Sequence, residues 1–203
     1  MRKKYSELRE EASKSLDGKW MMAALATLIY IIIAAGCSSI PFIGTVLAFL
    51  IGYPLVYGYY ILLLDGFRGA EKLELGTLFE GFKDYGRIFG TMFLMFIYLF
   101  LWTLLLVIPG IIKGYSYALT PYILRDEPQL KFNGAIEKSM RMMEGHKMDL
   151  FILDLTFIGW GLLCVITFGL AYFWVAPYFQ TARIAFYEML KAEQAEEEPA
   201  TEM

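Results

Sequence analysis

Three long stretches of this chain contain no Asp, Glu, Lys, Arg or His. They run from Trp20 to Leu64, from Ile88 to Ile112 and from Leu155 to Ala182. A hydrocarbon core about 30 Å thick takes roughly 20 apolar residues of helix to cross. The first stretch is long enough for two crossings, and each of the others for at least one. This absence of charge excludes an ordinary soluble domain and predicts a polytopic membrane protein.

Residues that carry catalytic chemistry or bind metals are also scarce. The chain has one histidine, His146, which alone cannot make the usual zinc site. Its two cysteines, Cys37 and Cys164, lie in apolar stretches without a CxxC partner, so we interpret them as small buried hydrophobes. GxSxG, HExxH and P-loop motifs are all missing. We therefore predict no catalytic residue, no cofactor and no metal site.

Charge composition narrows the expected partners. The net charge is −3 and no basic arm stands apart from the apolar stretches, which argues against nucleic acid. The expected partner is the lipid bilayer, with membrane proteins or a second copy of the chain as open alternatives. The start of the chain, with Arg2 before an apolar run that reaches Cys37, resembles a lipoprotein signal. The apolar run continues well beyond Cys37, so an uncleaved first helix is favoured.

Glycine and proline break the apolar stretches in a repeating way. Each break is followed by a second proline, which predicts three helical hairpins with tight turns. The predicted turns and helix breaks are Pro41, Gly44, Pro54, Pro109, Gly110, Pro121, Gly169 and Pro177. The predicted repeat units are about 1–70, 71–130 and 131–190 within one integral membrane domain, 1–190. We expect an acidic disordered tail at 191–203.

The fold class expected from this pattern is all-α, with six transmembrane helices. The predicted crossings are 20–40, 44–64, 88–108, 110–126, 150–167 and 169–190, of which 110–126 is the shortest. Each unit also begins with apolar residues at helical spacing, which predicts amphipathic helices at the membrane interface. These residues are Tyr5, Leu8, Ala12 and Leu16, then Leu75, Leu78, Phe79, Phe82 and Phe89, then Phe132, Ile136, Met140 and Met143.

The distribution of basic residues predicts the orientation. The segments before Trp20, at 65–87, at 125–149 and after 182 hold every Lys and Arg except Lys113. Basic residues favour the cytoplasmic side, so six crossings with both termini in the cytoplasm satisfy the rule. Five crossings would place Arg183 and Lys191 outside.

Two ionisable residues lie within the last predicted hairpin. Asp154 lies fourteen residues before Phe168 and Arg183 fifteen after it. At about 1.5 Å per residue both lie at a similar depth, so antiparallel helices can pair them. We predict an intramembrane ion pair with a structural role, and a proton or ion relay is the alternative.

Several motifs resemble an uncharacterised bacterial integral membrane family, catalogued as domain of unknown function 975. The motifs are the run from Leu101 to Tyr117, the segments 78–82, 139–145 and 157–160, and the pairs Pro177-Tyr178 and Phe186-Tyr187. The resemblance implies a multi-pass protein of the bacterial cytoplasmic membrane and no assigned reaction. More distantly, the hairpin pattern is similar to the membrane domain of some glycerophosphodiester phosphodiesterases, without their catalytic domain.

The expected function follows from the missing chemistry and the three amphipathic segments. We expect a non-enzymatic membrane protein that acts as an accessory, scaffold or regulatory component through lipid or protein contacts. The alternative is a small transporter or channel subunit, in which Pro54, Pro121 and Pro177 open the helix backbone around a pathway. A membrane enzyme ranks third, with its only conceivable centre around Arg141, Glu144, His146 and Asp149.

Overall fold

The computed structural model describes residues 4–39 and 43–197 of the 203-residue chain. Throughout these residues the secondary structure is helical, and no strand is present. The helices are α1 (Tyr5–Ser15), α2 (Trp20–Ser38), α3 (Gly44–Phe67), η1 (Leu75–Phe82), α4 (Tyr85–Leu105), α5 (Val107–Ser116), α6 (Thr120–Asp126), α7 (Asn133–Met142), α8 (Lys147–Leu155), α9 (Ile158–Ile166) and α10 (Tyr172–Glu197).

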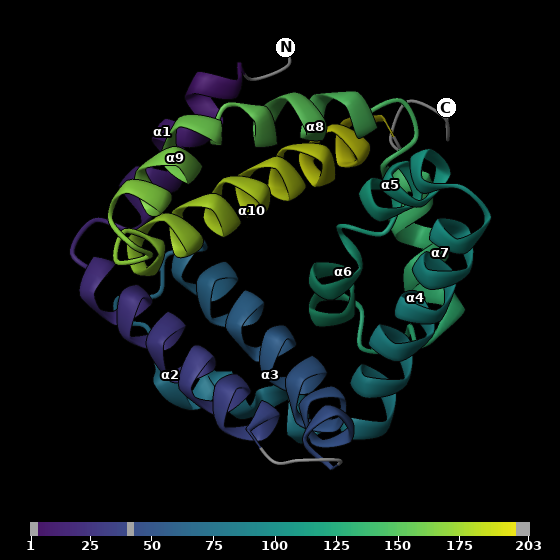
Figure 1. The fold of residues 1–203 in the computed structure, drawn as a ribbon. Helices are drawn as coiled ribbons and strands as arrows, with labels where there is room; N and C mark the ends of the chain where they lie inside the picture. The colour runs from purple at the N-terminus through teal and green to yellow at the C-terminus, as the bar shows by residue number, and fades with distance from the viewer. Residues whose placement is uncertain (1–3, 40–42, 198–203) are drawn as a thin grey trace.

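The helices are arranged as a ring (Figure 1). The first helical segment of each predicted repeat unit packs against the preceding predicted unit. The 3₁₀ helix η1 packs on α3, and α7 packs on α4 and α6. The first helix, α1, closes the ring because it packs on α10, the last helix of the chain. The described helices thus form a closed arrangement rather than a row.

Within residues 4–39 and 43–197, four helical segments are long and apolar enough to cross a membrane. They are Trp20–Cys37, Gly44–Phe67, Tyr85–Leu105 and Lys147–Ile166, which joins α8 and α9. The six-crossing arrangement is not confirmed. The predicted crossing 110–126 is divided between α5 and the short helix α6, and α10 carries Gln180, Arg183 and Glu188 within its length.

The three amphipathic segments are covered by protein to different extents. Leu8 and Ala12 of α1, and Leu16 directly after it, are buried, so this face packs inside the molecule rather than in the lipid interface. In the second segment only Leu78 of the predicted face is fully buried, whereas Phe79 and Phe82 are exposed. This segment is the 3₁₀ helix η1, and its backbone lies directly against α3.

Two glycines make that backbone contact possible. A Cβ on Gly58 of α3 would lie 2.0 Å from the carbonyl oxygen of Leu78, and one on Gly81 would lie 2.2 Å from that of Pro54. Both distances are shorter than any non-bonded contact allows, so only glycine fits at either position. Gly110 has a similar role, because its Cβ would lie 2.4 Å from the Thr103 hydroxyl of α4.

The hairpin turns differ in detail from the sequence prediction. The second hairpin turns at Leu106, whose backbone is extended, so Pro109 and Gly110 lie in the first turns of α5. Gly169 lies in the third turn with φ +86°, beside Phe168, whose side chain is 98% exposed. Gly44 begins α3, and Pro41 lies outside the described residues.

Pro54 and Pro177, predicted to break helices, lie inside α3 and α10, and neither helix ends at its proline. Proline has no N–H, so Pro54 leaves the carbonyl of Leu50 without its usual helical donor. The hydroxyl of Tyr85 donates to this carbonyl at 3.1 Å. Pro121 lies in the first turn of α6, where its missing N–H has no intrahelical partner to lose.

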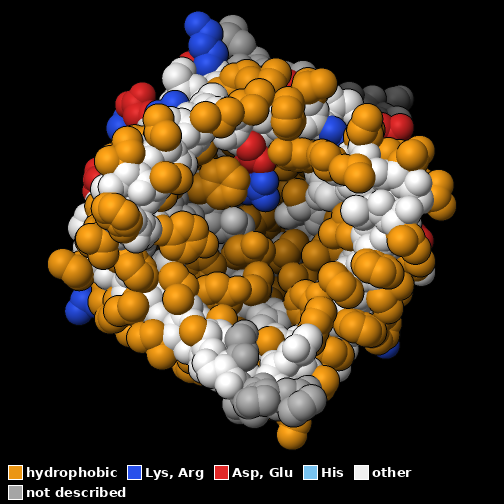
Figure 2. Space-filling view, viewed as in Figure 1, with side chains coloured by type: hydrophobic (Ala, Val, Ile, Leu, Met, Phe, Trp, Pro, Cys, Tyr) orange, Lys and Arg blue, Asp and Glu red, His pale blue; other side chains and the backbone are white. Residues whose placement is uncertain are grey.

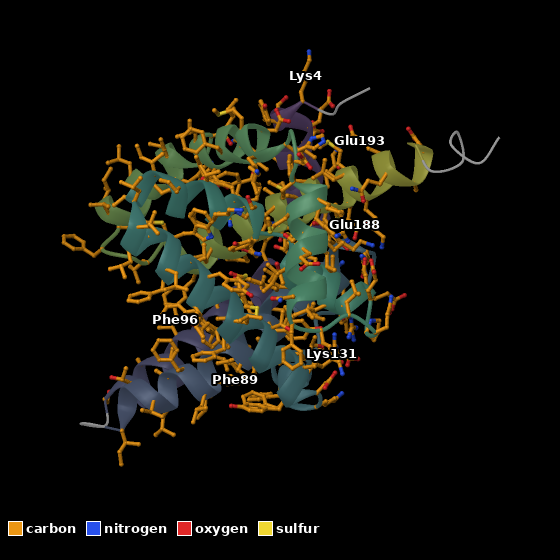
Figure 3. The ribbon with its side chains drawn as sticks, turned by 90° about the vertical axis from the view of Figure 1, so that its right-hand side faces the viewer. Lys4, Phe89, Phe96, Lys131, Glu188 and Glu193 are labelled. Carbon is orange, nitrogen blue, oxygen red and sulfur yellow. The ribbon has the colours of Figure 1, made fainter. Side chains whose placement is uncertain are left out.

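The molecule has a charged side and an apolar side. In Figure 3, Lys4, Lys131, Glu188 and Glu193 lie to the right of Phe89 and Phe96, so the described chain begins and ends on the charged side. The adjoining ends of α2 and α3 lie at the opposite, left side. The helix α10 extends through residues 191–197, part of the predicted disordered tail, because Ala, Glu, Gln and Lys are good helix formers.

Candidate binding hollow

A hollow of about 580 Å³ opens between the helices of the first and third units. Figure 2 shows it from the front of the ring as a depression with mostly apolar walls, in which acidic and basic atoms are visible. Its lining residues come from α2, α3, the α8–α9 segment and α10. They are Thr27, Tyr30, Val56, Tyr59, Tyr60, Asp154, Phe157, Ile158, Gly161, Cys164, Tyr172, Val175, Ala176, Phe179 and Gln180.

The structure brings Asp154 and Arg183 together at this hollow. Nε of Arg183 donates to Oδ1 of Asp154 at 3.0 Å, and a second guanidinium nitrogen contacts Oδ2. The Asp154 and Arg183 side chains are 13% and 27% exposed, so water screens the pair only in part. Because the two oxygens of the carboxylate meet two nitrogens of the guanidinium, the pair has a fixed geometry.

Two aromatic residues complete the surroundings of the pair. The hydroxyl of Tyr115, in α5, donates to Oδ2 of Asp154 at 3.0 Å. The Arg183 guanidinium lies 4.7 Å from the centre of the Phe179 ring, within the range of a cation–π contact. Asp154, in α8, is thus linked to both α5 and α10, and its oxygens are occupied by protein donors.

A second, smaller hollow of about 170 Å³ lies beside the first one. Arg183 lines it together with residues of α4, α5 and α6, and both hollows share Tyr60 and Gln180. The amide nitrogen of Gln180 contacts the hydroxyl of Tyr122, and both side chains are buried. The pair Asp154–Arg183 therefore stands at the boundary between the two spaces.

Further polar contacts stabilise the wall of the larger hollow. The hydroxyls of Thr27 in α2 and Tyr59 in α3 lie 3.0 Å apart, and the ring of Tyr30 stacks on that of Tyr59. Thr27 also donates to the carbonyl of Ala23 in its own helix. These contacts fix the tyrosine rings that form one side of the space.

A charged network joins the three units on the charged side of the molecule. Asp126 of α6 accepts two hydrogen bonds of 2.7 Å from Arg68, which follows α3. Tyr187 of α10 donates to Asp126 at 2.9 Å, and Lys191 forms an ion pair with it. Arg68 also donates to Glu188 of α10 at 2.7 Å.

The network changes the pKa of its members. Burial alone would raise the pKa of Asp126, but hydrogen bonds from Arg68, Lys191 and Tyr187 outweigh it and lower that pKa well below the usual range. Hydrogen bonding to Asp126 raises the pKa of Arg68 despite burial. A second network lies nearby, in which Arg125 contacts Glu80 at 2.6 Å and Asp65 at 3.0 Å.

The other residues considered from the sequence lie apart from the hollow. Lys113 lies over the ring of Trp102, 5.2 Å from its centre. Arg141, Glu144 and His146 line a separate polar depression of about 410 Å³ beside α10. Within residues 4–39 and 43–197 no group of three or more His, Cys, Asp or Glu side chains could hold a metal ion.

Sequence reasoning missed several of these residues. Gln180 is the only side-chain amide in the third uncharged stretch. A single amide in an apolar stretch could have marked it as a candidate site residue. Tyr115 and Asp126 offered no such signal, because tyrosines are common near membrane interfaces and Asp126 lies in a charged segment. Cys164 lines the hollow rather than being buried in the core.

In the described part of the chain the structure is all-helical and four helical segments have the length and apolar composition of membrane spans, which indicates a membrane protein. Residues 103–194 match the model of the family described as "Protein of unknown function (DUF975)". The family resemblance drawn from the sequence motifs is confirmed over this region. Neither a curated protein nor a solved structure matches the chain.

Proposed function

We propose that this protein is a non-enzymatic accessory component of a bacterial cytoplasmic membrane, which works by binding a lipid-like molecule in the hollow. The observation that supports this most directly is the hollow itself. It is a concave, largely apolar space of about 580 Å³ with a few convergent polar groups, the usual composition of a ligand site.

The way in which the polar groups are used favours binding over catalysis. A general base must be able to reach the proton that it removes. Both oxygens of Asp154 already accept hydrogen bonds, from Arg183 and Tyr115. The carboxylate is therefore held as a fixed element of the wall.

The orientation in the membrane is part of the same proposal. Basic residues gather on the side where the described chain begins and ends, which favours a cytoplasmic position for this side. The hollow then opens toward the outer side of the membrane. We propose that α5 with α6, and the first half of α10, complete the second and third hairpins to give six crossings.

A pair of matched substitutions on α9 tests the binding function. Neither Gly159 nor Gly161 has an atom within 4 Å of its Cβ position, but only Gly161 lines the hollow. We expect Gly161→Phe to fill the space and Gly159→Phe to leave it open. Each protein is to be extracted from bacterial membranes in polymer-bounded lipid discs, and its co-purified molecules identified by mass spectrometry.

The expected result is a molecule that accompanies the wild type and the Gly159 variant but is depleted in the Gly161 variant. Equal amounts of the co-purified molecule in all three proteins, or no co-purified molecule in any of them, would contradict the proposal. Comparable thermal unfolding midpoints of the two variants serve as the control for folding.

A transporter is the second candidate, and the pair of hollows on either side of Asp154 and Arg183 favours it. Two of the prolines invoked for it do not support it, since Tyr85 satisfies the carbonyl freed by Pro54 and Pro121 begins α6. Solute flux into liposomes containing the purified protein, lost in Asp154→Ala, would place this function first.

A further inference from the structure

The polar end of the hollow is electrically neutral, which restricts the head group that it can accept. Asp154 lines the hollow, and its partner of opposite charge, Arg183, lines the adjoining smaller hollow. Gln180, which lines both hollows, is uncharged. A charged head group that displaced either member of the pair would leave the other charge partly buried without a partner, at considerable cost in free energy. An uncharged head group avoids this cost.

Hydroxyl groups suit this end of the hollow better than purely apolar ones. A hydroxyl both donates and accepts, so it can donate to a carboxylate while accepting from a guanidinium. Hydrogen bonds to charged partners are stronger than those between neutral groups. The two opposite charges of the pair thus recognise a hydroxyl without any change in net charge.

One side of the wall suits a single apolar chain. From Asp154 the lining continues through Phe157, Ile158 and Gly161 to Cys164, ten residues further along and near the α9–α10 turn. At about 1.5 Å per residue this is a path of about 15 Å. Val175 and Phe179 of α10 face the same space.

We propose that the hollow binds a neutral, single-chain amphiphile with a hydroxyl-bearing head, such as a monoacylglycerol. The head lies at Asp154, where the carboxylate is paired with Arg183 at the boundary with the smaller hollow, and the chain follows the α9–α10 wall toward Cys164. This inference rests on the proposed binding function and names its ligand class.

Three probes that share one apolar chain and differ in head charge test the proposal. They are 1-oleoylglycerol, oleate and oleylamine, offered to the purified full-length protein in lipid nanodiscs at pH 7. Native mass spectrometry measures the fraction of protein bound at several probe concentrations. For the wild type we expect 1-oleoylglycerol to bind more tightly than either charged probe by about tenfold, the usual value of one charge-assisted hydrogen bond.

Substitutions that change the charge of the hollow provide a second, sharper readout. In Asp154→Asn the guanidinium of Arg183 is unpaired, so we expect the preference to change to oleate. In Arg183→Gln the carboxylate is unpaired, and oleylamine should bind best. The double variant Asp154→Asn with Arg183→Gln is neutral again and should return to 1-oleoylglycerol. Glu10→Gln, on the exposed surface of α1, is the matched control and should keep the wild-type order.

The outcomes separate the ligand class from the proposed function. A wild-type preference for either charged probe overturns the neutral head group but leaves binding in the hollow intact. Failure of all three probes to bind, together with no depletion in Gly161→Phe, overturns both. If the single variants do not fold, the order of the three probes on the wild type and the double variant still decides the question.

Discussion

At the scale of single residues, Tyr85 and Pro54 illustrate how an apolar helix satisfies its backbone. The Tyr85 hydroxyl donates to the Leu50 carbonyl, which Pro54 has left without a helical donor. In hydrocarbon, where water cannot replace the missing bond, an unsatisfied carbonyl is costly. We expect Tyr85→Phe to lower the free energy of unfolding by about 1–3 kcal/mol. Thermal unfolding in lipid nanodiscs measures this change.

The control for this prediction restores the missing N–H. In a Pro54→Ala background, the backbone N–H at position 54 can donate to the Leu50 carbonyl itself. The further substitution Tyr85→Phe should then have a much smaller effect. Equal losses in the wild-type and Pro54→Ala backgrounds would show that the hydroxyl stabilises the protein in some other way.

The lowered pKa of Asp126 makes the stability of the protein depend on pH. Its pKa in the folded protein is lowered, because hydrogen bonds from Arg68, Lys191 and Tyr187 outweigh burial. A lowered pKa means that the stabilisation is present above the unfolded value, about 3.9, and is lost as the pH falls through the folded value. We expect Asp126→Asn to lower the unfolding midpoint at pH 7. Because the variant has no carboxylate at this position, it should lose less stability than the wild type when the pH is lowered.

Comparing unfolding midpoints between pH 7 and pH 3 tests this prediction. The curve of the wild type should fall more steeply toward low pH than that of Asp126→Asn. Glu10→Gln removes an exposed carboxylate that is paired only with Lys14, and we expect little change from it. Parallel curves for the wild type and Asp126→Asn would contradict the assignment.

The sequence was informative about residue pairs within a hairpin and uninformative about pairs between hairpins. Counting residues from the Phe168 turn placed Asp154 and Arg183 at one depth, and in the structure they are in contact. Counting residues from a turn cannot relate Arg68 to Asp126, because these two residues belong to different predicted hairpins. Their contact depends on how the units are arranged around the ring, which periodicity does not encode.

At the scale of elements, the contact between η1 and α3 depends on glycine. We expect Gly81→Ala to destabilise the protein by about 3 kcal/mol, at the upper end of typical overpacking, because the new Cβ meets the backbone of Pro54. Gly86→Ala in α4 is the matched control, since its Cβ position has nothing within 4 Å. For Gly86→Ala we expect the free energy of unfolding to rise by up to about 1 kcal/mol.

Chemical or thermal unfolding of the two variants gives the comparison. Similar stabilities for Gly81→Ala and Gly86→Ala would mean that η1 moves away from α3 without cost, and would contradict the tight packing described above. A binding measurement with 1-oleoylglycerol on each variant shows whether the position of η1 affects the hollow.

The ends of the early helices could be predicted more closely than those of the later ones. The crossings expected at 20–40 and 44–64 correspond to α2 and α3, because uniform apolar stretches end at clear breaks. The segment 110–126 forms two helices with a bend at 117–119 between them. Apolar composition predicts burial or membrane exposure, but a bend between α5 and α6 depends on packing, which a hydropathy pattern does not contain.

At the scale of the whole molecule, contacts between the first and last helices close the described helices into a ring. Each initial segment packs on the preceding unit, and α1 returns to α10. The apolar face of α1 is therefore needed to close the ring rather than to lie on the lipid surface. A ring leaves its centre unfilled wherever the side chains are too short to meet, and the hollow lies at this centre (Figures 1 and 2).

The most direct test of a binding hollow that opens to the outer side uses the protein's own cysteine. In a Cys37→Ser background Cys164, which lines the hollow, is the only cysteine. A membrane-impermeant maleimide applied to intact cells should label Cys164, and 1-oleoylglycerol should slow this labelling. A cysteine placed at Ala192, in a chain without Cys37 and Cys164, should stay unlabelled. Labelling at position 192 with none at Cys164 would contradict the account, because the hollow would then open to the cytoplasm.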